Sequence, residues 1–462
     1  MRKVIIRTFL VIIIVLLAYG INYVWQAFPI ISGYGAKALC SCTMLAGRPA
    51  DQVISEELGS GLLSLGSFEV NYADSSATAT VFGLAKRKAI YRKGLGCTLV
   101  NEITEAELRN QPWKNVTAPV TDPDTVPWPT GNKMPEEVNL YGYNIELLNK
   151  TINEAFSEPG PEKTIRTRAV VVLHNGNLIA EKYAEGFTVN TRLMGWSMTK
   201  SLTNAMMGVL VRGGNLSMTD HAPVKRWQND DRNSITLENL MQASSGLDWQ
   251  EVYSGPSMAT TMLFKKRDAG LYAADVPLKH TPGEVFYYSS GTTNILSRII
   301  RETVGDENYH RFPYDRIFHK VGMYSMVIEP DPGGTFVGSS FSYATARDWA
   351  RFGLLYLNDG YWMGERILPE GWVEFTATPA KGAKRGEYGA QFWLNAGEPG
   401  NHSNRTYPDV PEDMFYCSGY ESQYVWIIPS KNLVVVKLSL TTGAEMDDNA
   451  FLKNIIAALP EE

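Results

Sequence analysis

Strand-like sequence lies at both ends of residues 136–462, and helical sequence fills the middle. Residues 169–173 and 178–183 flank Asn175-Gly176, a pair favoured in the tight type I′ turn of a hairpin. Further β-rich runs lie near the C-terminus, at 390–395, 413–418, 422–429 and 432–440. Between them, apolar residues recur at helical spacing at 235–244, 293–305 and 344–359. The predicted fold class is α/β of the α+β kind: one antiparallel sheet built from both ends of the domain, with an all-helical lobe inserted.

An apolar segment precedes this region at the start of the chain. Residues 9–18 are an unbroken apolar run, and apolar character continues to Trp25, close to the ~20 residues that a membrane-spanning helix needs. Arg2, Lys3 and Arg7 precede the run, which favours a cytoplasmic N-terminus and export of the rest of the chain. Residues 1–28 are therefore predicted to be a membrane anchor, with the rest of the chain periplasmic or extracellular.

Two other interpretations of the N-terminus also export the chain. Ala36-Lys37-Ala38 has the A-x-A form of a signal-peptidase site, although it lies farther from the apolar run than such sites usually do. Cleavage there would give a secreted protein. A lipoprotein attached at Cys40 or Cys42 is a third, weaker interpretation.

Residues 29–109 are predicted to form a small α+β module. Alternating runs at 68–72 and 78–82 flank a turn-forming Asp-Ser-Ser sequence. Because an exported module can form disulfides, we expect Cys97 to pair with Cys40 or Cys42, and we favour Cys40. Residues 110–135 hold six of the 24 prolines and are predicted to be a linker or surface strap before the main domain at 136–462.

Composition excludes several classes of function for this chain of 462 residues. Lys and Arg number 43 against 49 Asp and Glu, a net charge of −6, so the basic excess of a nucleic-acid-binding protein is missing. The four cysteines include no C-x-x-C pair, and the six histidines include no H-x-x-x-H pair. We therefore expect no nucleic acid partner, no metal site and no cofactor.

The strongest chemical motif is Ser197-x-x-Lys200, which occurs once in the sequence and opens an apolar helical stretch after the predicted hairpin. Residues three apart share a helix face, and a helix start favours developing negative charge. A serine hydroxyl needs a base to become a nucleophile, and a lysine can act as that base if burial keeps it neutral. The alternative interpretation is an N-cap serine followed by a solvated lysine.

Two more segments contain candidate site residues. The sequence PGEVFYYSSG, residues 282–291, precedes a helical stretch, and Cys417-Ser418-Gly419-Tyr420 ends a C-terminal strand. Taken singly, they would be an aromatic anchor for a turn and a hairpin corner. In this order and spacing after Ser197-x-x-Lys200, they resemble the serine β-lactamase and penicillin-binding-protein superfamily. The similarity is to its class C and esterase side, especially the 6-aminohexanoate-dimer hydrolases, and covers about residues 140–460.

The resemblance implies a role for each matching residue. Ser197 would be the acylated nucleophile, and Lys200 with Tyr288 would act as general base and then as acid for the leaving group. The backbone N–H groups of Ser197 and Tyr420 would form the oxyanion hole. Substrate contacts would come from Trp196, Ser290, Cys417, Ser418 and Gly419. We also expect an aromatic-lined cleft made by Trp196, Tyr287, Tyr288, Tyr416 and Tyr420.

Two positions depart from the family pattern. Ser290 stands where the tyrosine motif normally ends in Asn, and Cys417 stands where the family places a Lys or His. That cation usually helps to bind the carboxylate of a β-lactam or a D-alanyl-D-alanine peptide, and a cysteine cannot replace it. The departures favour esters or amides without this carboxylate.

We therefore expect a serine hydrolase that cleaves a small ester, amide or peptide-like substrate through an acyl-enzyme, as an esterase or an amidase of the 6-aminohexanoate-oligomer kind. A β-lactamase or D-alanyl-D-alanine peptidase is the first alternative. The alternative from another class is a catalytically silent cell-envelope binding module, which would have lost one of Ser197, Lys200 and Tyr288. An α/β-hydrolase would need G-x-S-x-G, and Thr199 replaces the second glycine.

Overall fold

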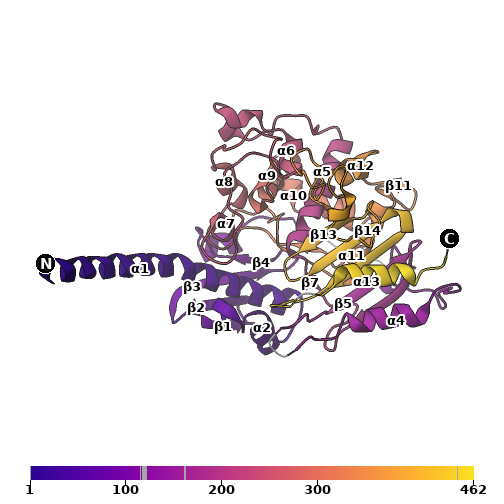
Figure 1. Ribbon diagram of the computed structural model, residues 1–462, viewed down its shortest axis with the longest axis horizontal. Helices are drawn as coiled ribbons and strands as arrows, with labels where there is room; N and C mark the ends of the chain where they lie inside the picture. The colour runs from indigo at the N-terminus through magenta and orange to yellow at the C-terminus, as the bar shows by residue number, and fades with distance from the viewer. Residues whose placement is uncertain (1, 115, 117–121, 161–162, 445, 462) are drawn as a thin grey trace. The chain divides into compact units, whose positions relative to one another are not determined.

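The computed structural model describes residues 2–114, 116, 122–160, 163–444 and 446–461 (Figure 1). The chain divides into two compact units. Unit 1 comprises Met1–Gln111, Gln250–Ala269 and Pro330–Gly334, and unit 2 comprises Pro112–Trp249, Gly270–Glu329 and Thr335–Glu462. The predicted boundaries place everything after residue 135 in one domain, whereas the structure assigns two segments of that range to unit 1.

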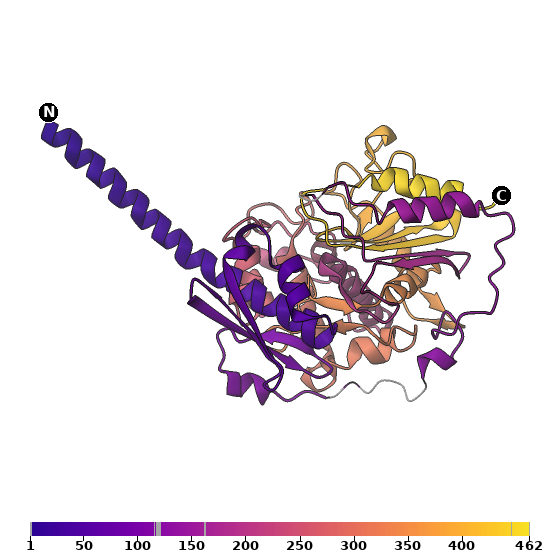
Figure 2. The ribbon, with the colours of Figure 1, turned by 90° about the horizontal axis from the view of Figure 1, so that it is seen from below.

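The first element of unit 1 is the helix α1 (Arg2–Cys40), whose N-terminal part projects as a single helix in Figure 2. Residues Val4–Leu45 are long and apolar enough to cross a membrane, judged by length and composition. The helix is almost wholly exposed up to Gln26 and largely buried from Ala27 onward. One helix therefore combines an exposed apolar half with a half that belongs to the core of unit 1.

A four-stranded antiparallel sheet packs against the buried half of α1. Its order is β1 (Gly66–Asn71), β2 (Ser76–Val81), β3 (Leu84–Arg92) and β4 (Gly96–Leu99). A disulfide joins Cys40, the last residue of α1, to Cys97 of β4, while Cys42 remains a buried thiol. The sheet thus includes the two predicted strands and adds two more.

Short helices complete unit 1. The π-helix η1 (Ser41–Leu45), α2 (Ala50–Glu57), the 3-10 helix η2 (Gly61–Leu65) and α3 (Glu105–Arg109) come from the N-terminal segment. A fifth, α7 (Met258–Lys265), comes from the segment that leaves unit 2 after Trp249. The rings of Phe264 and Tyr34 lie 5.5 Å apart, so α7 packs directly on α1.

The sheet of unit 2 is built from both ends of that unit, as predicted. Its order is β12 (Trp393–Leu394), β13 (Phe415–Gly419), β14 (Gln423–Ile428), β15 (Leu433–Leu438), β5 (Ala169–His174) and β6 (Asn177–Tyr183), with every neighbouring pair antiparallel. Asn175 and Gly176 between β5 and β6 have φ values of 51° and 76°. Both are positive, as a type I′ turn requires.

Helices cover both faces of this sheet, and Figure 2 shows it between them. On one face, α4 (Ile145–Glu154) and α13 (Asp448–Ala457) bury Ile152 and Leu452 against Trp426. On the other face lies α11 (Ala346–Leu357), where a Cβ on Gly353 would come within 2.6 Å of Val434. The remaining α-helices in the described part of unit 2 are α5 (Thr199–Arg212), α6 (Leu237–Met241), α8 (Ala269–Ala274), α9 (Ser290–Val304), α10 (Asp306–Tyr309) and α12 (Trp372–Ala377).

Small strands connect these helices. The order β7 (Leu193–Met194), β9 (Ser342–Ala344) and β8 (Val327–Ile328) forms a three-stranded sheet next to the start of α5, and β10 (Tyr361–Trp362) pairs with β11 (Glu365–Arg366). The mixed antiparallel architecture agrees with the fold expected from the sequence.

The described part of the proline-rich segment packs on unit 2 as a strap. Arg351 of α11 is 1% exposed and donates hydrogen bonds to the carbonyl oxygens of Pro129 and Gly131. Its guanidinium also lies 4.7 Å from the centre of the Trp128 ring. A buried arginine therefore holds residues 128–131 in place.

Candidate active site

Ser197 lies in a 3-10 turn, η4 (Trp196–Met198), between β7 and α5. The preceding Trp196 has a φ of 46°, in the left-handed region that residues other than glycine rarely occupy. The hydroxyl of Thr199 donates to the Trp196 carbonyl at 2.6 Å and so braces this turn. The N-cap of α5 is Met198, without a side-chain cap, which rules out the alternative that Ser197 caps the helix.

Lys200 is buried in the first turn of α5, with 2% of its surface exposed. Its Nζ donates hydrogen bonds to Ser197 Oγ at 3.1 Å, Ser290 Oγ at 3.0 Å and the Ser339 carbonyl at 3.0 Å. The alternative of a solvated lysine is therefore wrong. Two of these three partners are hydroxyls, which can donate a hydrogen bond as well as accept one.

The partners of Lys200 are held by the helix that follows the tyrosine loop. Ser290 begins α9, directly after the N-cap Ser289. One turn on, buried Asn294 donates from Nδ2 to Ser339 Oγ at 3.0 Å and accepts from the Ser339 N–H at 3.3 Å. Asn294 thereby fixes the carbonyl that Lys200 contacts. Neither Ser339 nor Asn294 is among the predicted site residues, although a polar residue four positions after Ser290 on an apolar helix was an available signal.

Tyr288 lies beside the lysine. Lys200 Nζ is 4.7 Å from the centre of the Tyr288 ring. The ring also makes aromatic contacts. It stacks on Trp393, with the ring centres 5.2 Å apart, and meets Tyr388 edge-on, with the ring centres 6.0 Å apart. Aromatic packing thus holds Tyr288 next to the Lys200 side chain.

The end of β13 lies against the turn that carries Ser197. A Cβ on Gly419 would lie 2.3 Å from the Gly195 carbonyl oxygen, so only glycine fits this approach. The rings of Trp196 and Tyr420 meet edge-on at 5.7 Å. The family pattern implies that Gly419 lets the end of β13 approach the substrate closely. In the structure, its missing side chain also lets β13 approach the backbone of the serine turn.

Gln423 stabilises the turn after Gly419. Its Nε2 donates to the carbonyls of Tyr420, Glu421 and Ser439, and its Oε1 accepts from the Ser439 N–H at 3.1 Å. Glu421 and Ser422 both have positive φ, at 62° and 66°. The side chain of Gln423 is thus the brace for a tight turn that positions the Tyr420 N–H. Nothing in the sequence pattern singles it out.

Two expected site residues lie below the surface. Cys417 is 1% exposed, and burial raises the pKa of its thiol to about 12, so it is neutral. Its thiol interacts with Ser201, one position after Lys200. Tyr416 is 6% exposed and packs edge-on to Tyr407 in the core. Tyr416 therefore belongs to the core rather than to the expected aromatic cleft, and the Cys417 side chain lies below the surface. Ser418, the residue after Cys417, is half-buried.

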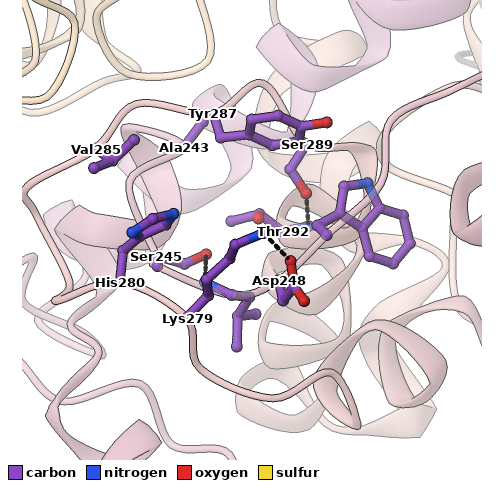
Figure 3. Close-up of a pocket in the computed structure, with 12 residues that line it drawn as sticks. Ala243, Ser245, Asp248, Lys279, His280, Val285, Tyr287, Ser289 and Thr292 are labelled. Carbon is purple, nitrogen blue, oxygen red and sulfur yellow. Dashed lines mark hydrogen bonds and ion pairs between the residues drawn. The ribbon is translucent and has the colours of Figure 1, made fainter.

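A polar pocket adjoins the tyrosine loop within unit 2 (Figure 3). Tyr287 and Ser289 line it, and an ion pair of 2.7 Å between Lys279 and Asp248 crosses it. Neither Ser197 nor Lys200 is among its lining residues. The pocket therefore lies beside Tyr287 and Ser289 of the tyrosine loop, and the Ser197 and Lys200 side chains do not line it.

Comparison with known proteins identifies the family. The sequence model of the β-lactamase family matches residues 152–458. The chain belongs to the β-lactamase family. A curated relative, the 6-aminohexanoate-dimer hydrolase of Paenarthrobacter ureafaciens, is 26% identical over 59% of this chain and 72% of its own length. The family match and the similarity to this hydrolase together identify the chain as a serine hydrolase.

Solved structures agree on the fold. The octameric penicillin-binding protein homologue from Pyrococcus abyssi aligns with a TM-score of 0.50 and 18% identity, covering 69% of this chain and 79% of that one. A family VIII carboxylesterase aligns with a TM-score of 0.53 and 13% identity, covering 68% of this chain and 96% of that one. At these sequence identities, each structure supports the similarity of the fold and no statement about function.

Proposed function

We propose that this β-lactamase-family hydrolase cleaves ester or amide bonds through an acyl-enzyme on Ser197, with Lys200 and Tyr288 moving the proton. The observation that carries the proposal is the 3.1 Å hydrogen bond between Lys200 Nζ and Ser197 Oγ. It joins a potential nucleophile to a base that is 2% exposed. The presence of all three residues argues against a silent binding module.

The proposed reaction has two halves. Ser197 Oγ attacks the carbonyl carbon while its proton passes to Lys200, and the carbonyl oxygen becomes an oxyanion bound by the N–H groups of Ser197 and Tyr420. Lys200 hands that proton on through Tyr288 to the leaving group as the bond to the leaving group breaks. Water next attacks the acyl carbon and gives one proton to the Lys200 and Tyr288 pair. The bond between the acyl carbon and Ser197 Oγ then breaks, the pair returns this water-derived proton to Ser197 Oγ, and the acid leaves. A single oxyanion-hole donor contributes roughly 10²–10³ in rate in such reactions.

The proposed substrates lack the carboxylate of β-lactams. The support is Cys417, which is neutral and buried where related enzymes place a cation. A simple ester presents no such carboxylate. In an amide of the 6-aminohexanoate-dimer kind that the curated relative's name specifies, the carboxylate is separated from the amide nitrogen by five methylene groups. Neither therefore calls for a cation in this position. Trp196, Ser418 and Gly419 are proposed to border the substrate, and Ser290 to hold Lys200.

The enzyme is proposed to be anchored by α1, with the catalytic region exported. Support comes from the Ala36-Lys37-Ala38 sequence, which is helical and buried, with Ala36 at 0% and Ala38 at 8% exposure. A signal peptidase needs an accessible, extended chain at this point. The alternative, a secreted protein, would require the core of unit 1 to be cut.

Fluorophosphonate labelling tests the nucleophile. Purified full-length protein should react covalently with a fluorophosphonate probe, and Ser197→Ala should not. Ser234→Ala is the control, because that exposed hydroxyl only donates to the Asp231 carbonyl. Equal labelling of the wild type and Ser197→Ala would overturn the assignment.

Substrate comparison tests the proposed class. We expect p-nitrophenyl butyrate and the 6-aminohexanoate dimer to be hydrolysed faster than nitrocefin. A higher rate on nitrocefin would establish β-lactamase activity and contradict the role given to Cys417.

A further inference from the structure

Six exposed apolar side chains of unit 1 flank α1 where it changes from exposed to buried. They come from η2, the β2–β3 turn and the segment before α7, with exposures from 37% for Leu65 to 67% for Phe82. We call them the apolar collar: Leu62, Leu65, Phe82, Leu84, Val252 and Tyr253. Scattered apolar side chains on a surface are ordinary, whereas a group gathered around one helix marks an interaction site.

One side of the apolar collar is fixed by the β2–β3 turn. The ring of Phe82 lies 5.9 Å from that of Phe28 on α1. Gly66 pairs with Val81, so the end of η2, with Leu65, lies beside the same turn. Phe82 has a φ of 51°, a strained turn conformation that holds an aromatic ring outward instead of the usual glycine or asparagine.

The other side of the apolar collar lies along the opposite flank of the same helix segment. A Cβ on Gly255 would come within 2.9 Å of the Tyr23 hydroxyl. Val252 and Tyr253, each 47% exposed, precede that contact by two or three residues. The apolar collar therefore meets α1 between Tyr23 and Phe28.

The depth of this position follows from helix geometry. Arg7 is the last charged residue before the apolar run. A bilayer core of ~30 Å takes ~20 helical residues, so a span that starts at Thr8 ends at Ala27. Trp25, 80% exposed, lies in the last turn of that span, where aromatic residues favour the membrane interface. The first residue after the span is Phe28, whose ring contacts Phe82 of the apolar collar.

Cationic groups lie farther along α1 than the apolar collar. Phe264 contacts Tyr34 of α1. At 1.5 Å per residue, Tyr34 lies roughly 9 Å farther along the helix axis than Phe28. Lys265, the neighbour of Phe264, therefore lies about that far from the apolar collar along α1. Burial, together with nearby Arg87 and Lys266, lowers the pKa of Lys265. The Nε of Arg87 is buried without a hydrogen-bond partner in the described part of the chain. Lys266 is itself paired with Glu102 at 2.9 Å, so the positive charge that anionic headgroups would offset comes from Lys265 and Arg87.

We propose that the apolar collar docks on the bilayer that α1 spans, with its side chains in the interfacial layer and Arg87 and Lys265 near lipid phosphates. The inference rests on the proposed anchoring by α1. The bilayer is the occupant because the apolar collar continues the surface of a helix that lipid already surrounds, so docking adds no bimolecular cost. The segment Gln250–Ala269 is thereby held at the membrane surface as part of unit 1.

Spin labels on the full-length protein test this docking. Phe82→Cys, Tyr72→Cys and Leu16→Cys are labelled one at a time and reconstituted into vesicles of phosphatidylcholine and phosphatidylglycerol. Tyr72 is the matched control, since it is 62% exposed but lies at the far end of β1, beyond the pairing of Asn71 with Ser76. Cys42 and Cys417 are buried, and the wild type gives their background. Collision with oxygen reports lipid, and collision with a water-soluble nickel chelate reports solvent.

The label at Phe82 is expected to show an oxygen-to-nickel collision ratio several-fold higher than the label at Tyr72. A Phe82 ratio equal to that of Tyr72 would overturn docking, as would low collision with both reagents, which would indicate a protein partner such as a second copy. The label at Leu16 separates the two proposals. If Leu16 is in lipid and Phe82 is not, docking fails and anchoring stands, whereas a solvent-exposed Leu16 overturns both.

Discussion

At the scale of single residues, the two parts of the Tyr288 side chain do different things. Packing holds its ring, and its hydroxyl is proposed to carry a proton. Tyr288→Phe keeps the stack on Trp393 and removes only the hydroxyl. We expect kcat/KM on p-nitrophenyl butyrate to fall by about 10²–10⁴, the usual contribution of a general acid–base group. Tyr361→Phe is the control, because that exposed hydroxyl donates to the Gly364 carbonyl away from the site. Full activity of Tyr288→Phe would contradict the proposed role.

Cys417 gives a prediction about pH. Burial raises the pKa of its thiol from 9.0 to about 12. Between these values the unfolded thiol loses its proton while the folded thiol keeps it, so the folded state loses stability as pH rises from 9 to about 12. The slope is at most ~1.4 kcal/mol per pH unit. Urea unfolding at pH 8 and pH 10 should therefore show the wild type losing stability relative to Cys417→Ser. An unchanged difference would mean that the thiol ionises alike in both states.

At the scale of elements, the contact between β13 and the serine turn depends on Gly419. In Gly419→Ala, the new Cβ would lie 2.3 Å from the Gly195 carbonyl, so strand and turn must separate. Because this moves the proposed oxyanion donors apart, we expect kcat to fall by about 10²-fold, the effect of a misplacement near 1 Å. Gly160→Ala is the matched control, since no atom lies within 4 Å of the position that its Cβ would take. Equal kcat in the two variants would contradict the spatial argument.

Elements with a local signal were predictable from the sequence. The Asn175-Gly176 turn, the strands on both sides of it and the helix after Ser197 follow from residue types a few positions apart. Among the motif residues, Lys200 contacts both Ser197 Oγ and the Tyr288 ring, and Gly419 lies against the turn that carries Ser197.

The elements that were missed depend on distant contacts. Asn294 contributes to the site because the chain brings Ser339, 45 residues later, into hydrogen-bonding distance of its side chain. Gln423 is a brace only because β14 and β15 place the Ser439 backbone beside it. Helix α7 joins unit 1 because Phe264 packs on Tyr34, 230 residues earlier in the chain, and no local spacing encodes that contact.

At the scale of the whole molecule, two compact units share one chain that passes between them several times. Unit 1 consists of the N-terminal 111 residues and two excursions from the hydrolase fold, at Gln250–Ala269 and Pro330–Gly334. Asn101 Nδ2 donates to the Phe264 carbonyl at 3.0 Å, and Gln111 Nε2 donates to the Pro332 carbonyl at 2.6 Å. The N-terminal module is thus completed by loops that the hydrolase sequence supplies, which a simple spacer would not require.

The disulfide between Cys40 and Cys97 should stabilise unit 1 selectively. It closes a sequence separation of 57 residues, which in the chain-entropy description corresponds to about 4 kcal/mol. In Cys97→Ala, we expect amide hydrogen exchange to accelerate in β3 and β4 of unit 1 and to stay unchanged in β14 and β15 of unit 2. The control is Cys42→Ala, which removes a buried thiol from the same unit without breaking a crosslink.

Exchange measured by mass spectrometry on the full-length protein in micelles resolves the two units in one experiment. Selective acceleration in unit 1, with fluorophosphonate labelling retained, would show that the units open independently and that the serine site does not need an intact unit 1. Equal acceleration in all four strands would contradict this, because it would mean that the two excursions couple the units into one cooperative fold. Loss of labelling without acceleration in β14 and β15 would place the coupling in the segment after Trp249 rather than in the sheet.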